Sequence, residues 1–248
     1  MRLLILALVL LPAAAQAQDN RLVFRLGGGV ASDPGYFGSD ESVLSPDFAF
    51  SFAYANVAGY EFGDPDPYAP ASGISFGPSF RIVGARLAED YPELAGLEDI
   101  ETAYELGVSV GYAGPGYEVF GAVRRGFGGH EGVVAELGAD AVFRVDDQLV
   151  LTAGPRLLAG NDAYAATYFG VTEAEALASA FPAYEATGGL ISAGIEVGMD
   201  YRFAPDWSLY ATARWDRLQG DAADSPIVRD DTQVSLSLGV TRVFDFRF

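Results

Sequence analysis

The end of the chain, residues 232–248, alternates between apolar and polar side chains with a period of two. The apolar positions are Val234, Leu236, Leu238 and Val240, followed after Arg242 by Phe244, Phe246 and Phe248. The positions between them are mostly polar, among them Gln233, Ser235, Ser237 and Thr241. Successive side chains of a β-strand point to opposite faces, so this period predicts a strand with one apolar face. The chain must therefore form a sheet whose two faces meet different environments.

Earlier segments show the same alternation and are separated by stretches rich in Gly, Pro, Asp and Glu. The full set covers residues 21–31, 47–62, 73–86, 102–113, 117–126, 132–145, 148–160, 189–203, 207–218 and 232–248. Alternating segments of about ten residues joined by turn residues are typical of transmembrane β-barrels. Lipid offers no hydrogen-bond partner to a free sheet edge, so we expect an all-β, closed antiparallel transmembrane β-barrel of ten strands. A hairpin near Asn56 would instead require twelve, because these barrels have an even strand number.

The lengths of the connections indicate how the barrel is oriented. Short turns are expected at 114–116, 146–147 and 204–206, and long loops at 87–101, 127–131, 161–187 and 220–230. Outer-membrane barrels have short periplasmic turns and longer outer loops, so we expect the long loops outside the cell. Residues 172–180 are good helix formers, with Thr172 as N-cap and Glu175 three residues on, and predict a short helix in the longest loop.

The first residues have the layout of a secretory signal peptide. Arg2 precedes an apolar run from Leu3 to Leu11, and the small-residue ending Ala15-Gln16-Ala17 follows. We expect cleavage after Ala17, which leaves residues 18–248 as a single outer-membrane β-barrel domain. The apolar run is shorter than the about 20 residues that a transmembrane helix needs. The chain contains no Cys, and export followed by folding without disulfides suits the envelope of a Gram-negative bacterium.

Several polar positions in the alternating segments carry charges that a closed barrel would turn toward its lumen. These residues are Glu105, Glu136, Asp140, Arg144, Arg156, Glu196, Asp200, Arg202 and Arg214. A barrel of ten strands is narrow, so we expect opposite charges to pair and fill the interior as a structural network. The alternative is that the same charges select ions.

The sequence offers no motif for catalysis, for a cofactor or for a metal. The one histidine, His130, lies beside glycines in a predicted outer loop, and on an extended backbone Glu131 points away from it. We interpret His130 as a solvated loop residue, because no nucleophile or acid pair accompanies it. The acidic residues of 64–67 match no compact Ca²⁺ loop. The net charge of −19 argues against nucleic-acid binding, which needs a basic surface.

Three stretches resemble the MltA-interacting protein family, also called the MipA/OmpV family. They are Pro34-Gly35-Tyr36-Phe37-Gly38-Ser39-Asp40, Tyr168-Phe169-Gly170-Val171-Thr172 with its continuation to Gly189, and residues 218–228. The terminal strand also resembles the C-terminal recognition strand of outer-membrane barrels. The resemblance implies an outer-membrane β-barrel without enzymatic activity. The family's namesake joins a membrane-bound lytic transglycosylase to a peptidoglycan synthase, and other members are described as osmotically responsive proteins, porins or adhesins.

Two functions therefore remain open. The first is a scaffold that contacts the lipid of the outer membrane and links this membrane to peptidoglycan-remodelling enzymes. The second is a small channel, or an adhesin or receptor, that acts through the lumen and the outer loops. Short periplasmic turns offer a scaffold little contact area, and a narrow, charge-filled lumen argues against a general porin. The resemblance favours the scaffold.

Overall fold

The computed structural model describes residues 20–248, and the expected signal peptide at 1–17 lies outside the described residues. Within this range, eleven strands form one antiparallel sheet in the order β3-β2-β1-β11-β10-β9-β8-β7-β6-β5-β4. The strands are β1 (Arg21–Pro34), β2 (Ser42–Val57), β3 (Tyr60–Gly63), β4 (Gly73–Val83), β5 (Ala103–Gly114), β6 (Tyr117–Gly128), β7 (Val133–Arg144), β8 (Leu149–Gly160), β9 (Gly189–Ala204), β10 (Trp207–Leu218) and β11 (Thr232–Arg247). The all-β, antiparallel prediction is confirmed.

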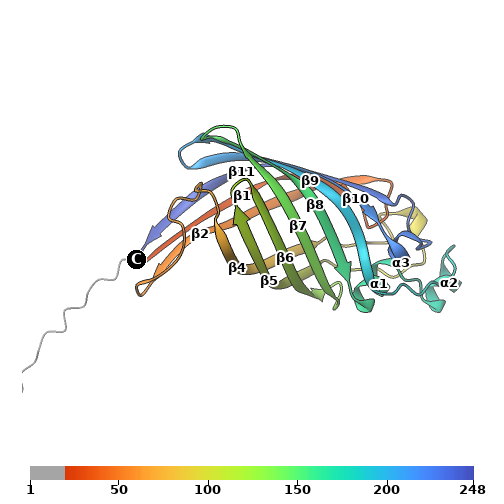
Figure 1. The fold of residues 1–248 in the computed structure, drawn as a ribbon. Coiled ribbons are helices and arrows are strands. Elements are labelled where there is room, and N and C mark those ends of the chain that lie inside the picture. The colour runs from red at the N-terminus through yellow and green to blue at the C-terminus, as the bar shows by residue number, and fades with distance from the viewer. Residues whose placement is uncertain (1–19) are drawn as a thin grey trace, which may run out of the picture.

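The sheet curls (Figure 1), and side chains from strands three positions apart meet across its inner face. Arg25 on β1 forms an ion pair with Asp200 on β9. The Tyr210 hydroxyl on β10 donates a 2.7 Å hydrogen bond to Asp47 on β2. The first strand, β1, pairs along its length with the last, β11. The two edges of the sheet are β3 and β4, and no ladder joins them within residues 20–248.

The preferred single strand at 47–62 is wrong and the alternative hairpin near Asn56 is confirmed, because the chain turns inside this segment. β2 ends at Val57, and Ala58 and Gly59 lead into β3 with positive φ values of 55° and 85°. Positive φ at both central residues is the geometry of a two-residue hairpin that follows the twist of its strands. Ten of the eleven strands are therefore long, and the eleventh, β3, has only four residues. The predicted counts of ten and twelve both refer to strands that cross the membrane, and crossing takes about 9–11 residues. The four-residue β3 is too short to count as such a strand.

The outer face of the curled sheet is apolar. On β5, Tyr104, Leu106, Val108 and Val110 are 47–69% exposed, whereas Glu105 between them is fully buried. Apolar surface of this extent is unusual on a soluble monomer and typical of the lipid-facing wall of a barrel. No helix within residues 20–248 is both long enough and apolar enough to cross a membrane.

At the end opposite the chain terminus, the loops fold together into a layer that we call the cap (Figure 1). The cap comprises residues 35–41, 84–102, 129–132, 161–188 and 219–231, and it holds η1 (Pro92–Leu94), α1 (Asp162–Phe169), α2 (Glu173–Ala178) and α3 (Gly220–Ala223). Four large side chains from three segments of the cap are fully buried: Leu94 of η1, Tyr164 and Phe169 of α1, and Ile227 of the last loop. The loops thus enclose two apolar cores, the first of which also includes the strand residues Val134, Leu158, Ile191 and Leu218.

The longest loop contains one helix that the sequence predicts and one that it does not. α2 lies within the predicted 172–180 and starts with a capping box between Thr172 and Glu175. α1 was missed because its sequence is apolar and aromatic without a clear polar face. Its start carries a signal nonetheless, since the Asn161 side chain caps the helix by accepting a hydrogen bond from the Tyr164 N–H.

Candidate functional site

The inner face of the sheet holds two connected clusters of ion pairs, the first of which surrounds the fully buried Glu105. The Glu105 carboxylate accepts hydrogen bonds from Arg81 Nη2 at 2.6 Å and from Arg124 Nε at 3.0 Å. His130 Nε2 lies 3.2 Å from the same carboxylate. Arg124 continues to Glu136 at 2.8 Å. These partners compensate for the high cost of taking a carboxylate out of water.

The second cluster centres on Arg156 and Arg214. Arg156 Nη2 lies 2.9 Å from both Asp140 and Glu196, and so connects the two strands that flank β8. Arg214 on β10 reaches Glu136 on β7 at 3.0 Å, across three strand positions. Glu136 therefore joins the two clusters, and together the ion pairs brace separated parts of the curled wall.

Not every charge that the sequence directs inward belongs to these clusters. Glu105, Glu136, Asp140, Arg156, Glu196 and Arg214 are joined, while Asp200, Arg202 and Arg144 lie apart. Arg202 donates a 2.8 Å hydrogen bond to the Asp147 carbonyl and lies 4.7 Å from the centre of the Tyr68 ring. Within residues 20–248, no carboxylate comes within 4.0 Å of the Arg144 guanidinium.

Four charged partners of the predicted inward residues were absent from the predicted set. Arg81 and Arg124 bind Glu105, Arg25 binds Asp200, and Asp216 accepts from Arg214. The period of two could also have identified Arg81 and Arg124 as inward-facing. Each follows an exposed apolar residue, Phe80 or Val123, whose side chain points to the opposite face. Which cation meets which carboxylate depends on register and curl, which alternation does not encode.

The interpretation of His130 as a solvated residue is wrong. Its side chain is 3% exposed and packs edge-on against Tyr164 and Tyr168 of α1, with ring centroids 5.0 and 5.4 Å away. His130 Nδ1 accepts the Gly132 N–H at 3.1 Å, which leaves Nε2 to donate to Glu105. Burial lowers the pKa of His130 below its ordinary value, although Glu105 partly opposes the shift. His130 therefore joins the cap to the ion pairs beneath it.

The three stretches that resemble the MltA-interacting family meet in the cap. Phe37 of the first stretch packs edge-on against Tyr168 of the second, with centroids 5.0 Å apart. Ser225 of the third donates a 2.6 Å hydrogen bond to the Phe169 carbonyl. Val228 and Phe37 pack against the same apolar core. Residues that carry the resemblance therefore take part in the contacts that hold the cap together.

Two buried charges tie the cap's helices to its η1 loop. Arg86 is 5% exposed and donates a hydrogen bond to the Tyr168 carbonyl at 3.3 Å. The Glu175 carboxylate accepts N–H hydrogen bonds from Glu98 at 3.0 Å and from Thr172 at 2.8 Å. Burial alone would raise the pKa of Glu175, but these N–H groups hold it below its ordinary value. The cap is thus fixed by polar as well as apolar contacts.

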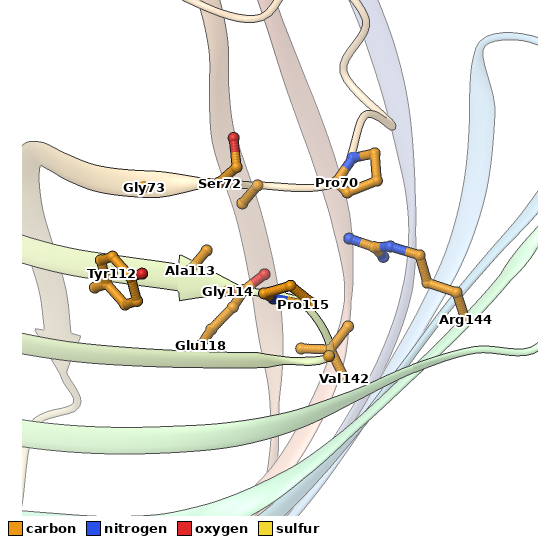
Figure 2. Close-up of a pocket in the computed structure, with 12 residues that line it drawn as sticks. Pro70, Ser72, Gly73, Tyr112, Ala113, Gly114, Pro115, Glu118, Val142 and Arg144 are labelled. Atoms are coloured by element: carbon orange, nitrogen blue, oxygen red, sulfur yellow. The ribbon is translucent and has the colours of Figure 1, made fainter.

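At the opposite end, beside the short turns, lies a pocket of about 580 Å³ that we call the mouth pocket. It is bounded by Pro70–Gly73, by Tyr112–Gly116 and by the side chains of Glu118, Val142 and Arg144 (Figure 2). Its volume is within the range of about 300–1,000 Å³ that is common for ligand sites. Within residues 20–248, no group of three or more His, Cys, Asp or Glu is placed to hold a metal ion.

Comparison with known proteins gives a family and distant structural relatives. The family profile described as MltA-interacting protein MipA matches residues 26–244. The MltA-interacting proteins of Escherichia coli K12 and Shigella flexneri are each 35% identical to this chain over 77 residues. That match covers 31% of this chain and 31% of each relative, so it spans less than a third of their length.

Two solved structures illustrate the distant similarity. The N-terminal β-barrel domain of Pseudomonas aeruginosa OprF is 15% identical, with 71% of this chain and 100% of that chain covered and a TM-score of 0.35. The Salmonella typhi OmpF complex with daunomycin is 10% identical, with 92% of this chain and 98% of that chain covered and a TM-score of 0.40. Similarities this weak carry no argument about the function of this chain.

The architecture and the family agree. A curled antiparallel sheet with an apolar outer face and a charged inner face is the architecture of an outer-membrane β-barrel protein. With the family profile extending over residues 26–244, the chain belongs to the MltA-interacting protein MipA family.

Proposed function

We propose that this protein is a non-enzymatic scaffold of the outer membrane that holds peptidoglycan-remodelling enzymes beneath it. The observation that carries the proposal is that ion-paired side chains line the inner face of the sheet and packed loops cover its loop end. Both leave little room for a pore. The relatives' name, MltA-interacting protein, supports a lytic transglycosylase as one partner. A peptidoglycan synthase is the second partner that we propose.

The orientation follows from the connections between the strands. The chain terminus and the short turns lie at one end and the cap lies at the other (Figure 1). In outer-membrane barrels the short turns face the periplasm and the long loops face outward. The cap then lies outside the cell, and the mouth pocket opens toward the compartment that contains peptidoglycan.

The inward charges act, in this proposal, as a structural network and not as an ion selector. Arg124 and Arg156 are 4% and 5% exposed and are held by carboxylates from neighbouring strands. Above them, Arg81 Nη2 donates a 3.3 Å hydrogen bond to the hydroxyl of Tyr164, a fully buried residue of α1. A permeating ion would have to displace both the α1 helix and these ion pairs.

We also propose that the wall is closed in the membrane, where the β2 and β4 edges meet and the ten long strands alone cross the lipid. Unpaired N–H and C=O groups at a lipid-exposed edge cost several kcal/mol each. The chain has no Cys, so cysteine pairs can be placed freely, one in residues 42–53 and one in residues 77–83. At least one pair should crosslink in native membranes, and the absence of crosslinks across the whole series would refute closure.

Two measurements on the same preparation test the scaffold. In planar bilayers the purified protein should give no steady current, and in pull-downs from envelope extracts it should retain a lytic transglycosylase. The expected contact is with the folded protein, so a heat-denatured sample serves as the control. Steady currents together with failure to retain the transglycosylase would overturn the proposal in favour of a small channel.

A second candidate is an adhesin or receptor that acts through the cap. The observation in its favour is Leu177 of α2, which is 91% exposed at the outer-loop end. A leucine exposed on an ordered helix can bury its apolar surface against a partner. Loss of binding to host or bacterial surfaces on Leu177→Asp, with an unchanged pull-down, would support this role.

A further inference from the structure

The mouth pocket presents two charges whose partners are missing. Arg144 is exposed and Glu118 is half-buried, and both side chains enter the pocket, from different sides (Figure 2). Within residues 20–248, neither group has an oppositely charged side chain within 4.0 Å. The contrast is with Arg124, Arg156 and Arg214 farther along the inner face, each of which meets at least two carboxylates. The pocket therefore offers one cation and one anion to a ligand.

Small residues supply much of the wall between these charges. Gly73, Gly114, Pro115 and Gly116 supply much of the lining. Gly73 and Gly116 have φ values of 75° and 80°, a conformation that other residues rarely adopt. A Cβ at Gly73 would meet nothing within 4 Å, so the surface there is open. Where glycine lines the pocket, the main chain of a ligand can approach closely.

We infer that the mouth pocket binds an extended peptide segment of a periplasmic partner, one that carries an acidic side chain for Arg144 and a basic side chain for Glu118. Arginine suits this task because its planar group can accept a carboxylate in a bidentate manner. The inference rests on the proposed scaffold role for the identity of the partner. It also answers the objection that short periplasmic turns offer little contact area, because a concave site requires less surface than a flat one of standard size.

The test uses the full-length protein in detergent micelles and dye-labelled synthetic peptides, with fluorescence anisotropy as the measurement. The peptides carry one Glu and one Lys in a Gly-Ser host, separated by one to four residues, and a Gly-Ser peptide without charges is the reference. At least one charged peptide should bind tenfold more tightly than the reference. Equal binding of charged and uncharged peptides would overturn the inference.

Charge variants then locate the site. Arg144→Glu should weaken binding of the preferred peptide about tenfold or more, the effect of losing about 1.4 kcal/mol. Arg217→Glu is the matched control, because Arg217 is an exposed arginine at the cap end, and it should leave binding unchanged. The double variant Glu118→Arg with Arg144→Glu exchanges the two charges and should restore binding with the order of Glu and Lys in the preferred peptide reversed. An equal loss in Arg144→Glu and Arg217→Glu would refute the site.

The failure of this inference is distinguishable from that of the scaffold. If the wild-type protein retains a lytic transglycosylase and Arg144→Glu retains as much, the scaffold stands and the mouth pocket is not its docking site. If the wild-type protein retains none, the scaffold fails, while the peptide titrations still report on the pocket. Resistance of the folded protein to SDS in unheated gel samples checks that each variant is folded.

Discussion

Replacement of Glu105 by Gln should destabilise the protein more than any other single loss of charge on the inner face. Glu105 is fully buried and accepts hydrogen bonds from Arg81 and Arg124. Removal of one partner from a buried ion pair costs about 3–5 kcal/mol, because the remaining charge stays out of water. Arg124 keeps Glu136 as a partner, and Gln keeps an acceptor oxygen. We therefore expect the lower end, about 3 kcal/mol, or roughly a hundredfold in the unfolding equilibrium constant.

Urea titration of the protein refolded into lipid vesicles, followed by tryptophan fluorescence, measures this loss. Glu101→Gln is the matched control, because Glu101 is an exposed carboxylate near the same strand, and surface substitutions of this kind change stability by less than about 0.5 kcal/mol. A loss below 0.5 kcal/mol for Glu105→Gln as well would refute the reasoning. It would mean that water reaches the carboxylate, and that the cap does not seal the ion pairs from above.

Two further predictions concern the cap. Burial lowers the pKa of His130, so the unfolded chain binds more protons than the folded one as pH falls through the ordinary histidine pKa of about 6.5. The stability of the folded protein should therefore drop below that pH. The urea midpoints at pH 8 and pH 5.5 should differ less in His130→Gln than in the wild-type protein. An equal drop in the variant would contradict a buried, neutral His130. Thr172→Ala removes the hydroxyl that accepts the Glu175 N–H at 3.2 Å and should cost about 1 kcal/mol, seen as faster amide exchange in residues 172–178, whereas unchanged exchange there would contradict the capping box.

Periodicity predicted the wall because it depends on each strand alone. An amphipathic strand shows its two faces in its own residues, so Leu106 and Glu105 are assigned to opposite sides without knowledge of their neighbours. The short turns were equally local, since Gly114-Pro115-Gly116 carries its own turn chemistry. The hairpin at Ala58-Gly59 was predicted only as an alternative, near Asn56, because Ala58 at positive φ has no local sequence signal.

The contacts inside the sheet and in the cap were not predictable in the same way. Arg25 and Asp200 are 175 residues apart in the chain, and they meet only because the sheet curls. His130 has the sequence of an exposed loop, yet Tyr164 and Tyr168 from another loop cover it. The Asn161 cap was the one available signal for α1. Such contacts depend on several loops at once, and no single stretch encodes them.

The central claim is that the apolar face of the curled sheet meets lipid while the charged face does not. The two tryptophans of the chain, Trp207 and Trp215, both lie on the outer side of β10 and are 38% and 47% exposed. The most direct test is quenching of their fluorescence by lipids with brominated acyl chains, with Trp207→Phe and Trp215→Phe to separate the two signals. Brominated lipids should quench both residues, and a water-soluble quencher should have little effect. Strong quenching by the water-soluble reagent and none by the brominated lipids, in protein that remains bound to the vesicles, would contradict the account.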